Sequence, residues 1–469
     1  MMGTSLNLPR LLLAAPRKSS GKTTLSLGLV RLMVRRGLTV QTFKKGPDYI
    51  DPRWLTQAAR PRDGSPGRPC RSLDPHLMGM SACGQRLARW GQGADVALVE
   101  ANMGVFDGQD PEGGDCAARM ARDLGMPLIL VVDCQGMGRS VAALVGGFLS
   151  FPDGQAIAGL LLNNVASPRH ENRMRSTLER YASVPVLGAV PRFSALGIEE
   201  RHLGLEPVDE HAGAEDLIDS LADRLADLLD VDALLALARQ APPLPGVESL
   251  PASVAAPCCR VGYAVDRAFH FYYPENLEAL EAAGVALVPL DLMGGGPFPD
   301  VAGLYIGGGF PEMFLDALGP EHAALAWVRQ RVAAGMPVYA ECGGLMFLSQ
   351  GIRWGGRSAA MAGVLPFGVE MTPRPQGYGY MEMTSTGALP WAAAGELRRC
   401  HEFHYSRPLD LPDGLTYAWR VRRGSGLGNG HDGVVVGSVY AGYAHWHAEV
   451  TQEWAPLWAD FWRRGRFGS

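Results

Sequence analysis

One stretch near the start of the chain, residues 10–52, constrains its fold more than any other. Apolar residues 11–15 predict a buried strand, and a loop of small residues separates them from the sequence Gly21-Lys22-Thr23-Thr24. The apolar positions that follow, residues 25, 29, 32 and 33, recur at helical spacing. The stretch is therefore typical of a strand, a tight loop and a helix that begins at the loop.

This order of elements indicates a phosphate-binding site. It gathers unpaired backbone N–H groups, the helix dipole and the Lys22 ammonium around one point, where phosphate oxygens can bind. We expect a nucleotide polyphosphate there, contacted by Ser20, Gly21, Lys22, Thr23 and Thr24. Thr23, the first hydroxyl after the lysine, is placed to hold the accompanying Mg²⁺. The loop departs from the ordinary pattern, because Pro16 stands at the position of its first glycine.

Length and composition narrow the class of protein. A chain of 469 residues has room for about two to four compact units. A net charge of −5 argues against a nucleic-acid partner, because no basic excess is present to neutralise phosphates. No apolar run approaches the roughly 20 residues of a membrane span, and the eight cysteines show no metal-binding spacing. We expect a cytoplasmic protein with reduced thiols and no membrane partner, and we leave open whether it forms a homodimer.

Strand and helix patterns alternate through the first half of the chain. Four further strands are expected at residues 94–101, 126–133, 156–164 and 184–191. Because these strands are apolar on both faces, they predict a parallel sheet covered by helices on both sides. Glu100 and Asp133 end two of the strands and should reach the carboxyl edge, where such sheets bind ligands. Residues 61–75 read as a surface loop, and residues 214–240 as one long amphipathic helix.

A proline-rich stretch, residues 241–259, reads as a linker between two domains. The first domain would then span residues 1–240 and the second residues 260–469. The second half starts a new alternation, with strands expected at residues 260–266, 285–290, 301–309 and 337–344. Both domains are therefore expected to be α/β.

The second domain carries a candidate nucleophile. Cys342 stands at an expected strand-to-helix elbow next to the glycines at 343 and 344, an arrangement that would expose the thiol and point a helix N-terminus at it. Both effects favour a thiolate. About 100 residues later, His445 is the candidate base for the thiol proton. Gly308 and Gly309 lie in a loop that could aim backbone N–H groups at a developing oxyanion.

Eight stretches together resemble one family. They are residues 43–52 (FKKGPDYIDP), 97–108 (ALVEANMGVFDG), 131–144 (VVDCQGMGRSVAAL), 184–205 (VPVLGAVPRFSALGIEERHLGL), 269–280 (FHFYYPENLEAL), 305–312 (YIGGGFPE), 340–344 (AECGG) and 401–406 (HEFHYS). In these stretches the chain resembles the cobyrinate and hydrogenobyrinate a,c-diamide synthases, and the resemblance covers nearly the whole chain. It implies an N-terminal P-loop domain of the dethiobiotin-synthetase type and a C-terminal class I glutamine amidotransferase domain.

The resemblance also implies roles for residues of the first domain. Lys22 and Lys44 match residues at the γ-phosphate, and Thr23, Asp48 and Glu100 match the Mg²⁺ site, with Lys44 and Asp48 counted as catalytic. Tyr49, Asp51 and Asp107 match positions that would orient the substrate or a second metal. The adenine contact would be Asn163 or Asn164. The cofactors implied are ATP and Mg²⁺.

In the second domain, Cys342 would attack the amide of glutamine and His445 would move the proton. Ordinary class I enzymes carry a glutamate two residues after this histidine, and His447 stands there in this chain. Glu402 and Glu449 are the acids that we considered as replacements.

The function implied is ATP- and glutamine-dependent amidation of the a and c acetates of cobyrinate or hydrogenobyrinate through an acyl phosphate, with small molecules as the only partners. One alternative within this class is amidation of sirohaem or a metal sirohydrochlorin, since relatives act on those acids. An alternative of another class is a P-loop ATPase switch that forms no amide. Such a switch would need neither Cys342 nor His445.

Overall fold

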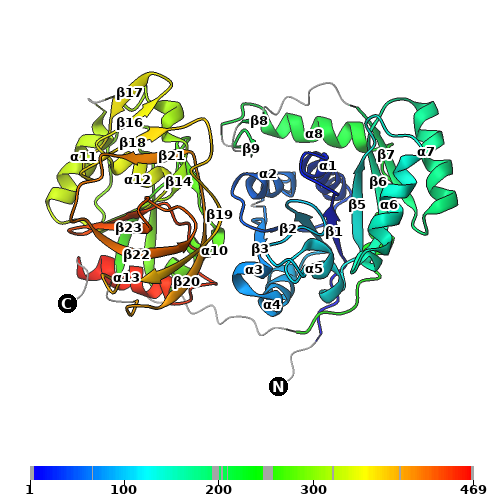
Figure 1. Cartoon of the computed structure of the whole chain (residues 1–469), viewed down its shortest axis with the longest axis horizontal. Coiled ribbons are helices and arrows are strands. Elements are labelled where there is room, and N and C mark those ends of the chain that lie inside the picture. The colour runs from blue at the N-terminus through cyan, green and yellow to red at the C-terminus, as the bar shows by residue number, and fades with distance from the viewer. Residues whose placement is uncertain are drawn as a thin grey trace. The chain divides into compact units, whose positions relative to one another are not determined.

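The computed structural model describes residues 5–65, 67–192, 200–201, 204–208, 210–246, 257–319, 322–389 and 392–465. The chain divides into two compact units, Met1–Leu250 and Pro251–Ser469, and each is described by itself (Figure 1). Most of the expected linker, residues 247–256, lies outside the described residues. Within the described part of the chain, no helix has both the length and the apolar character needed to cross a membrane.

A parallel sheet of seven strands forms the centre of the first unit, in the order β3-β2-β4-β1-β5-β6-β7. Its strands are β1 (Arg10–Ala14), β2 (Val40–Lys45), β3 (Arg71–Leu73), β4 (Val96–Ala101), β5 (Leu128–Asp133), β6 (Ile157–Val165) and β7 (Val186–Pro191). The strands are buried along nearly their whole length, which agrees with their continuous apolar sequences. The α/β class predicted for both halves is confirmed.

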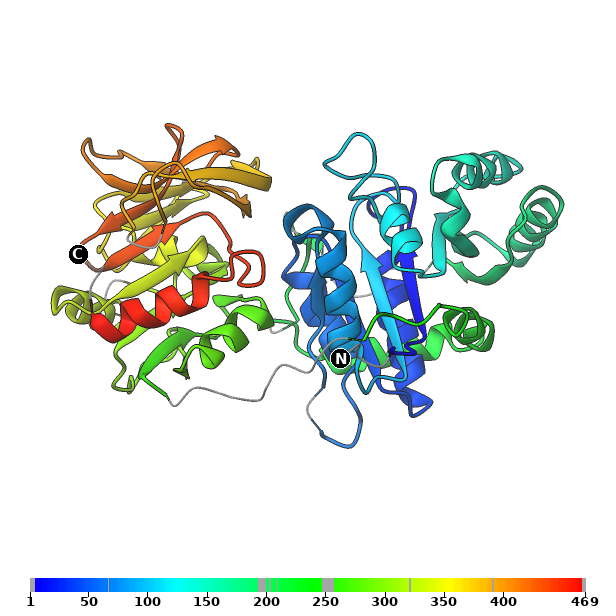
Figure 2. The ribbon, with the colours of Figure 1, turned by 90° about the horizontal axis from the view of Figure 1, so that it is seen from below.

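Helices cover both sides of this sheet (Figure 2). They are α1 (Lys22–Arg35), α2 (Ile50–Ala58), α3 (Pro75–Met78), α4 (Met80–Gly91), α5 (Ala117–Asp123), α6 (Ser140–Ser150), α7 (Pro168–Tyr181), α8 (Ala214–Leu225) and α9 (Val231–Ala238). One apolar core joins the strands to α4, α5, α6 and α7. Helices α1 and α9 instead contact β1 from the other face. A short hairpin of β8 (Glu200–Arg201) and β9 (Gly204–Leu205) precedes α8.

Two expectations for the first unit are wrong. The single helix expected over residues 214–240 is two helices, because the chain turns after α8 and Asp230 caps α9 by accepting a hydrogen bond from the backbone N–H of Ala233. The surface loop expected at residues 61–75 contains the buried edge strand β3. Three residues are too few to show a period, so only pairing with β2 makes this segment a strand.

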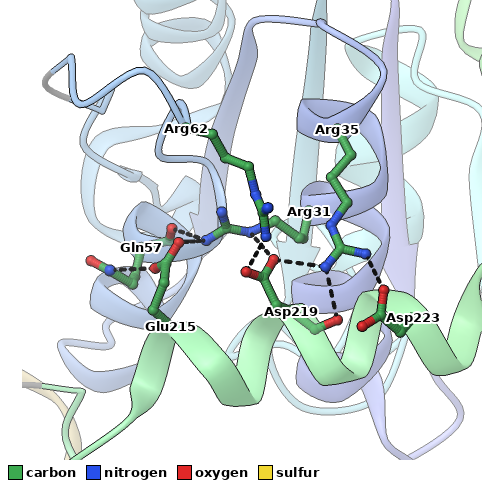
Figure 3. A network of polar contacts seen from close by, with 7 residues as sticks. All are labelled: Arg31, Arg35, Gln57, Arg62, Glu215, Asp219 and Asp223. Atoms are coloured by element: carbon green, nitrogen blue, oxygen red, sulfur yellow. Dashed lines mark hydrogen bonds and ion pairs between the residues drawn. The ribbon is translucent and has the colours of Figure 1, made fainter.

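An ion-pair cluster fastens α8 to α1 (Figure 3). Arg31 of α1 is fully buried and lies 2.7 Å from Glu215 and 3.7 Å from Asp219. Arg35, one turn further along α1, lies 2.9 Å from Asp219 and 2.5 Å from Asp223. The acids recur every four residues, so they form one stripe along α8 that faces the arginines of α1. The helix that begins at the phosphate loop is therefore held along its length by α8.

The second unit contains a mixed sheet of nine strands in the order β12-β10-β13-β15-β24-β23-β22-β19-β20. Strands β12, β10, β13, β15 and β24 run parallel to one another. From β24 onward, through β23, β22, β19 and β20, each strand pairs with the next in antiparallel fashion. The strands are β10 (Cys259–Ala264), β12 (Val285–Leu290), β13 (Gly303–Ile306), β15 (Val338–Glu341), β19 (Gly377–Ser385), β20 (Leu397–His404), β22 (Thr416–Arg423), β23 (His431–Val436) and β24 (Val439–Gly442).

Smaller elements complete the second unit. Strands β11 (Phe269–Phe271) and β14 (Gly308–Gly309) form a pair, and β16 (Gly351–Trp354), β17 (Arg357–Ala360), β18 (Gly368–Met371) and β21 (Ser406–Leu409) form a third sheet. The helices are α10 (Pro274–Ala282), α11 (Ala323–Ala333), α12 (Gly343–Leu348) and α13 (Trp454–Arg464). Helix α13 packs buried tryptophans and Phe461 into a core of aromatic side chains. Helix α12 follows directly after β15, as the expected elbow requires.

Candidate functional site

The loop between β1 and α1 has the geometry of a phosphate-binding loop. Ser19 (φ 55°) and Gly21 (φ 87°) both adopt the left-handed conformation, which curls the backbone before α1 begins. Lys22 is buried, and its Nζ donates to the carbonyl oxygens of Arg17 and Met103, each at 3.2 Å. Burial lowers the pKa of Lys22, and the charge of nearby Lys44 also lowers it, while Glu100 acts in the opposite direction. The Lys22 ammonium is thus folded over the loop. Phosphate oxygens bound there would replace the two carbonyl oxygens as its hydrogen-bond acceptors.

The two candidate adenine residues lie beside this loop. Nδ2 of Asn163 donates to the carbonyl oxygen of Ser20 at 2.9 Å. A Cβ atom at Gly21 would lie 2.1 Å from that same Nδ2, so glycine is required there. Asn164 donates to Oδ1 of Asp133 at 3.0 Å, and Oδ2 of Asp133 lies 3.0 Å from Arg17. Both asparagines therefore support the loop, and the adenine contact remains a prediction.

Lysine and carboxylate side chains converge below the loop. Oε1 of the fully buried Glu100 accepts hydrogen bonds from Thr23 Oγ1 at 2.9 Å and from Lys44 Nζ at 2.7 Å. Oδ2 of Asp51 accepts from the same two groups, at 3.3 Å and 2.5 Å. Oδ2 of Asp48 lies 3.7 Å from Lys44. The structure thus brings together five residues that the sequence predicted separately.

The pKa values of Asp48 and Asp51 in this cluster are shifted in opposite directions. Burial and the charge of Asp51 raise the pKa of Asp48 to about 7, although Lys44 opposes the shift. Burial alone would raise the pKa of Asp51, but Lys44 outweighs burial and holds that pKa below its usual value. Burial would lower the pKa of Lys44, but Asp51 and Glu100 keep it well above its usual range. The lysine is therefore always charged, and Asp48 is the group that can change its charge near neutral pH.

The donor atoms of the cluster fit Mg²⁺. Hydroxyl and carboxylate oxygens are the ligands that this hard cation prefers, usually one or two carboxylates completed by phosphate and water. Oε2 of Glu100 is buried and has no hydrogen-bond partner among the described residues. The described residues contain no ready-made set of three or more metal-ligating side chains, which agrees with Lys44 standing between the acids.

The remaining predicted residues of the first unit lie close by. Oδ2 of Asp107 accepts from the backbone N–H of Gly104 at 2.9 Å, closing the turn after β4. Val105 in that turn donates to the carbonyl oxygen of Ala15, so the turn lies against the start of the phosphate loop. Tyr49 is buried at the N-terminus of α2, and Thr24 is half-buried in the first turn of α1.

In the second unit, Cys342 stands at a sharp elbow between β15 and α12. Its backbone has φ 46° and ψ −99°, a conformation that non-glycine residues rarely adopt and that occurs where function demands it. Its N–H donates to the carbonyl oxygen of Gly442 at 2.8 Å. Cβ atoms at Gly343 and Gly344 would lie 2.9 Å from Gly309 N and 2.2 Å from Ile306 O, so both glycines are required. The strand-to-helix elbow is as predicted, but the expectation that it exposes the thiol is wrong, because Cys342 is buried.

The expectation that Cys342 is a thiolate is wrong. Burial raises the pKa of the Cys342 thiol well above its usual value, and the charges of Glu312 and Glu341 raise it further. The short helix α12 does not outweigh these effects. Cys342 is therefore protonated in the free protein, so a base must take its proton during the reaction.

His445 is placed beside the elbow by the strand order. It follows the end of β24, which pairs with β15 so that Glu341 and Gly442 are in register. Nδ1 of His445 lies 3.1 Å from Oε2 of Glu341, and both side chains are buried. The acid next to the base is therefore Glu341, not Glu402, whose carboxylate accepts from the backbone N–H groups of Ser425 and Gly426.

Glu341 was missed by the sequence analysis. The signal that could have found it is an acid at the last position of the buried strand before the nucleophile. A charged residue at such a position needs a partner. The ordinary class I pattern places this acid two residues after the histidine, so that pattern does not lead to Glu341.

The glycine-rich segment lies close to His445 and to the elbow at Cys342. A Cβ atom at Gly308 would lie 2.9 Å from Cε1 of His445, and Gly309 N lies next to Gly343. The N–H of Gly307 donates to the hydroxyl of Tyr272 at 2.8 Å, so it is not free to bind an oxyanion. Gly308 and Gly309 remain the predicted source of oxyanion donors.

Comparison with known proteins matches both units. Residues 11–205 match the model of the CobQ/CobB/MinD/ParA nucleotide binding domain, and residues 260–452 match that of the CobB/CobQ-like glutamine amidotransferase domain.

Among curated proteins, the chain is similar to the cobyrinate a,c-diamide synthase of Magnetococcus marinus, with 50% identity over 98% of each chain. It is 39% identical to the cobyrinate a,c-diamide synthase of Syntrophotalea carbinolica, over 98% of this chain and 99% of that one. It is also 40% identical to the hydrogenobyrinate a,c-diamide synthase of Rhodobacter capsulatus, over 86% of this chain and 91% of that one.

Proposed function

The chain belongs to the cobyrinate a,c-diamide synthase family, and from this premise we propose that it converts the a and c acetates of cobyrinate or hydrogenobyrinate into amides with ATP and glutamine. The observation that carries the proposal is similarity over nearly the full length of such relatives, in a chain that retains both a phosphate-binding loop and a cysteine–histidine site. We also propose that it works in the cytoplasm.

In the first unit, a substrate carboxylate oxygen attacks the γ-phosphorus of ATP. The bond from that phosphorus to the β–γ bridging oxygen breaks, so ADP leaves and the carboxylate becomes an acyl phosphate. Lys22 and Lys44 stabilise the negative charge that two approaching anions bring together. Mg²⁺, held by Thr23, Asp48 and Glu100, would neutralise further charge on the phosphate oxygens. Tyr49, Asp51 and Asp107 orient the substrate acid, and the proximity of Asp51 to Lys44 supports this placement.

In the second unit, the thiol proton of Cys342 passes to His445 while Sγ attacks the amide carbon of glutamine. His445 then gives that proton to the leaving nitrogen, and ammonia departs from a glutamyl thioester. Water hydrolyses the thioester to glutamate and restores the thiol. Backbone N–H groups of Gly308 and Gly309 stabilise the oxyanion in both steps. Ammonia displaces phosphate from the acyl phosphate, which leaves the amide.

The experiment incubates the protein with ATP, Mg²⁺, glutamine and each candidate macrocycle, including sirohaem. Mass spectrometry counts a loss of about 1 Da for each carboxyl group that becomes an amide. We expect two such losses for cobyrinate or hydrogenobyrinate. Amidation of sirohaem alone would favour the alternative substrate, and ATP hydrolysis without any amide would overturn the proposal.

A variant separates the two chemistries. Cys342→Ser should abolish the release of glutamate from glutamine but leave amidation driven by free ammonia. Cys400→Ser, which changes another buried cysteine of the same unit, should leave both activities in place. Loss of the ammonia-driven activity in Cys342→Ser would contradict the role of Cys342 as nucleophile alone.

A further inference from the structure

The acid that ordinary class I amidotransferases carry two residues after their histidine is absent from this chain. We propose that Glu341, the residue directly before the nucleophile, takes its place as the positioning residue for His445. The inference rests on the proposed roles of Cys342 and His445, and it names the group through which the base is oriented.

The contact between Glu341 and His445 is short and buried from solvent. Oε2 lies 3.1 Å from Nδ1, and the side chains are 1% and 2% exposed. In a buried site, screening by water is weak, so a charged hydrogen bond acts more strongly than on the surface. Glu341 ends β15 and His445 lies just beyond the carboxyl end of the adjacent parallel strand β24, so the strand order brings the pair together.

The other carboxylate oxygen is also held. Oε1 accepts a hydrogen bond from the hydroxyl of Tyr339, two residues earlier on β15, and lies 3.5 Å from the backbone N of Trp446. Tyr339 in turn accepts from Nε1 of Trp454 at 3.3 Å. Burial, together with the charge of Glu341, raises the pKa of Tyr339 well above its usual value, so its hydroxyl remains a donor. The carboxylate is therefore fixed at both oxygens.

This arrangement defines which nitrogen of His445 is the base. A carboxylate can only accept a hydrogen bond, so in the neutral ring the proton lies on Nδ1 and the lone pair on Nε2. When Nε2 takes the proton of Cys342, the imidazole becomes positively charged beside Glu341, which stabilises that charge. This matters because the Cys342 thiol has a raised pKa and gives up its proton reluctantly.

Neighbouring polar residues do not compete for this role. Nδ1 of His447 accepts from the backbone N–H of Glu449 at 3.2 Å, and its ring packs 4.5 Å from that of Tyr273. His401 stacks on His445 with ring centres 5.1 Å apart. Burial, followed by the charges of His445 and His447, keeps the pKa of His401 well below its usual value, so it stays neutral.

The first test compares Glu341→Gln with Glu402→Gln. Glu402 is the matched control, because the same change removes the charge of another buried acid in this unit, one that accepts from backbone N–H groups. We expect Glu341→Gln to lower kcat for glutamine hydrolysis about 10²- to 10⁴-fold with little change in KM, because the base loses its orientation and not the substrate pocket. Glu402→Gln should retain this activity. Amidation driven by free ammonia should survive in both, which shows that the protein is folded.

The second test reads the hydrogen bond directly. ¹⁵N NMR of histidine-labelled protein, with His445 assigned by its absence in His445→Ala, reports which ring nitrogen carries the proton. We expect Nδ1–H in the wild type, and a changed tautomer or a lost Nδ1–H signal in Glu341→Gln.

The inference is overturned if Glu341→Gln keeps the wild-type kcat for glutamine hydrolysis, or if its His445 signal is unchanged. It is also overturned if Glu341→Gln loses ammonia-driven amidation as strongly as it loses glutamine hydrolysis. If the wild type releases no glutamate, the proposed function fails. The NMR comparison still decides whether Glu341 fixes the histidine.

Discussion

Nζ of Lys44 lies 2.7 Å from Oε1 of Glu100, and the two residues face each other in register on the paired strands β2 and β4. Both side chains are almost completely buried, so each charge depends on the other for its stability. The pair lies at the carboxyl edge of the sheet, beside the helix that begins at Lys22. A positive group is therefore already fixed near the expected phosphates, with carboxylate oxygens next to it for a cation.

Glu100→Gln should abolish amide synthesis while glutamine hydrolysis continues. The variant removes the charge that balances Lys44 and a carboxylate proposed for Mg²⁺, and both belong to the first unit. Measurements of amide formation and of glutamate release on the same preparation check this. The matched control is Glu179→Gln, an exposed acid on α7 that should leave both activities intact. Equal damage to both activities by Glu100→Gln would contradict the assignment of separate sites.

Features governed by local sequence could be predicted. The strand, loop and helix around Gly21 and Lys22 follow from a continuous apolar run, small residues and a helical period. The elbow at Cys342 follows from the glycines after it, which leave space for Gly309 and Ile306. In both places the chemistry is tied to a short segment, so the sequence shows it directly.

Features that depend on distant partners could not be predicted. Strand β3 is a strand because β2 lies beside it, and its own three residues carry no signal. The contact between Glu341 and His445 joins residues 104 positions apart, and only the order of β15 and β24 in the sheet brings them together. The raised pKa of Cys342 likewise results first from burial by the surrounding fold, which no local stretch of sequence shows, although the charges of distant Glu312 and adjacent Glu341 add to it.

Asp219→Ala should destabilise the first unit more than Asp223→Ala. Asp219 contacts Arg31, Arg35 and Arg62, and Arg31 is fully buried, so removal of the acid leaves a buried charge with fewer partners (Figure 3). We expect a loss of about 1–3 kcal/mol in the free energy of unfolding. Asp223 is 71% exposed and contacts Arg35 alone among the residues of this cluster, so its loss should cost less than about 1 kcal/mol. Urea unfolding of both variants measures the difference, and equal effects would contradict it.

Two glycine-to-alanine changes should have opposite effects. A Cβ atom at Gly28 in α1 would lie 2.3 Å from Cδ1 of Leu225 in α8, and Leu225 is fully buried, so Gly28→Ala should displace that side chain from its packing and cost about 1–3 kcal/mol. Gly147 in α6 has no atom within 4 Å of its Cβ position. Gly147→Ala should therefore stabilise the protein by about 0.5–1 kcal/mol, because alanine loses less backbone entropy in a helix. Thermal unfolding checks both signs. Unchanged or increased stability in Gly28→Ala would contradict the tight packing at Leu225, and lower stability in Gly147→Ala would contradict the open space at that position.

The carboxyl group of Asp432 should make stability fall as pH rises. Its two oxygens accept from the backbone N–H groups of Tyr443 and Ala444, just before His445. Burial raises the pKa of Asp432 from 3.8 to about 6 in the folded protein, although these two hydrogen bonds oppose the shift. Between about pH 4 and pH 6 the folded chain therefore holds a proton that the unfolded chain has released. Stability is lost across that window, by about 3 kcal/mol for a shift of about two pKa units.

Urea unfolding of the wild type and of Asp432→Asn at pH 4.5 and pH 7.5 measures this effect. The difference in the free energy of unfolding between the two proteins is compared at the two pH values. The stability of the wild type relative to the variant should decrease on going to the higher pH, because asparagine does not ionise. Asp460→Asn is the control. Slight burial would raise the pKa of the partly exposed Asp460, but Arg463 and Arg464 outweigh it and lower that pKa, so its ionisation favours folding as pH rises. A wild type that gains stability over Asp432→Asn at the higher pH would show that the buried carboxylate is stabilised by its two N–H partners more than it is destabilised by burial.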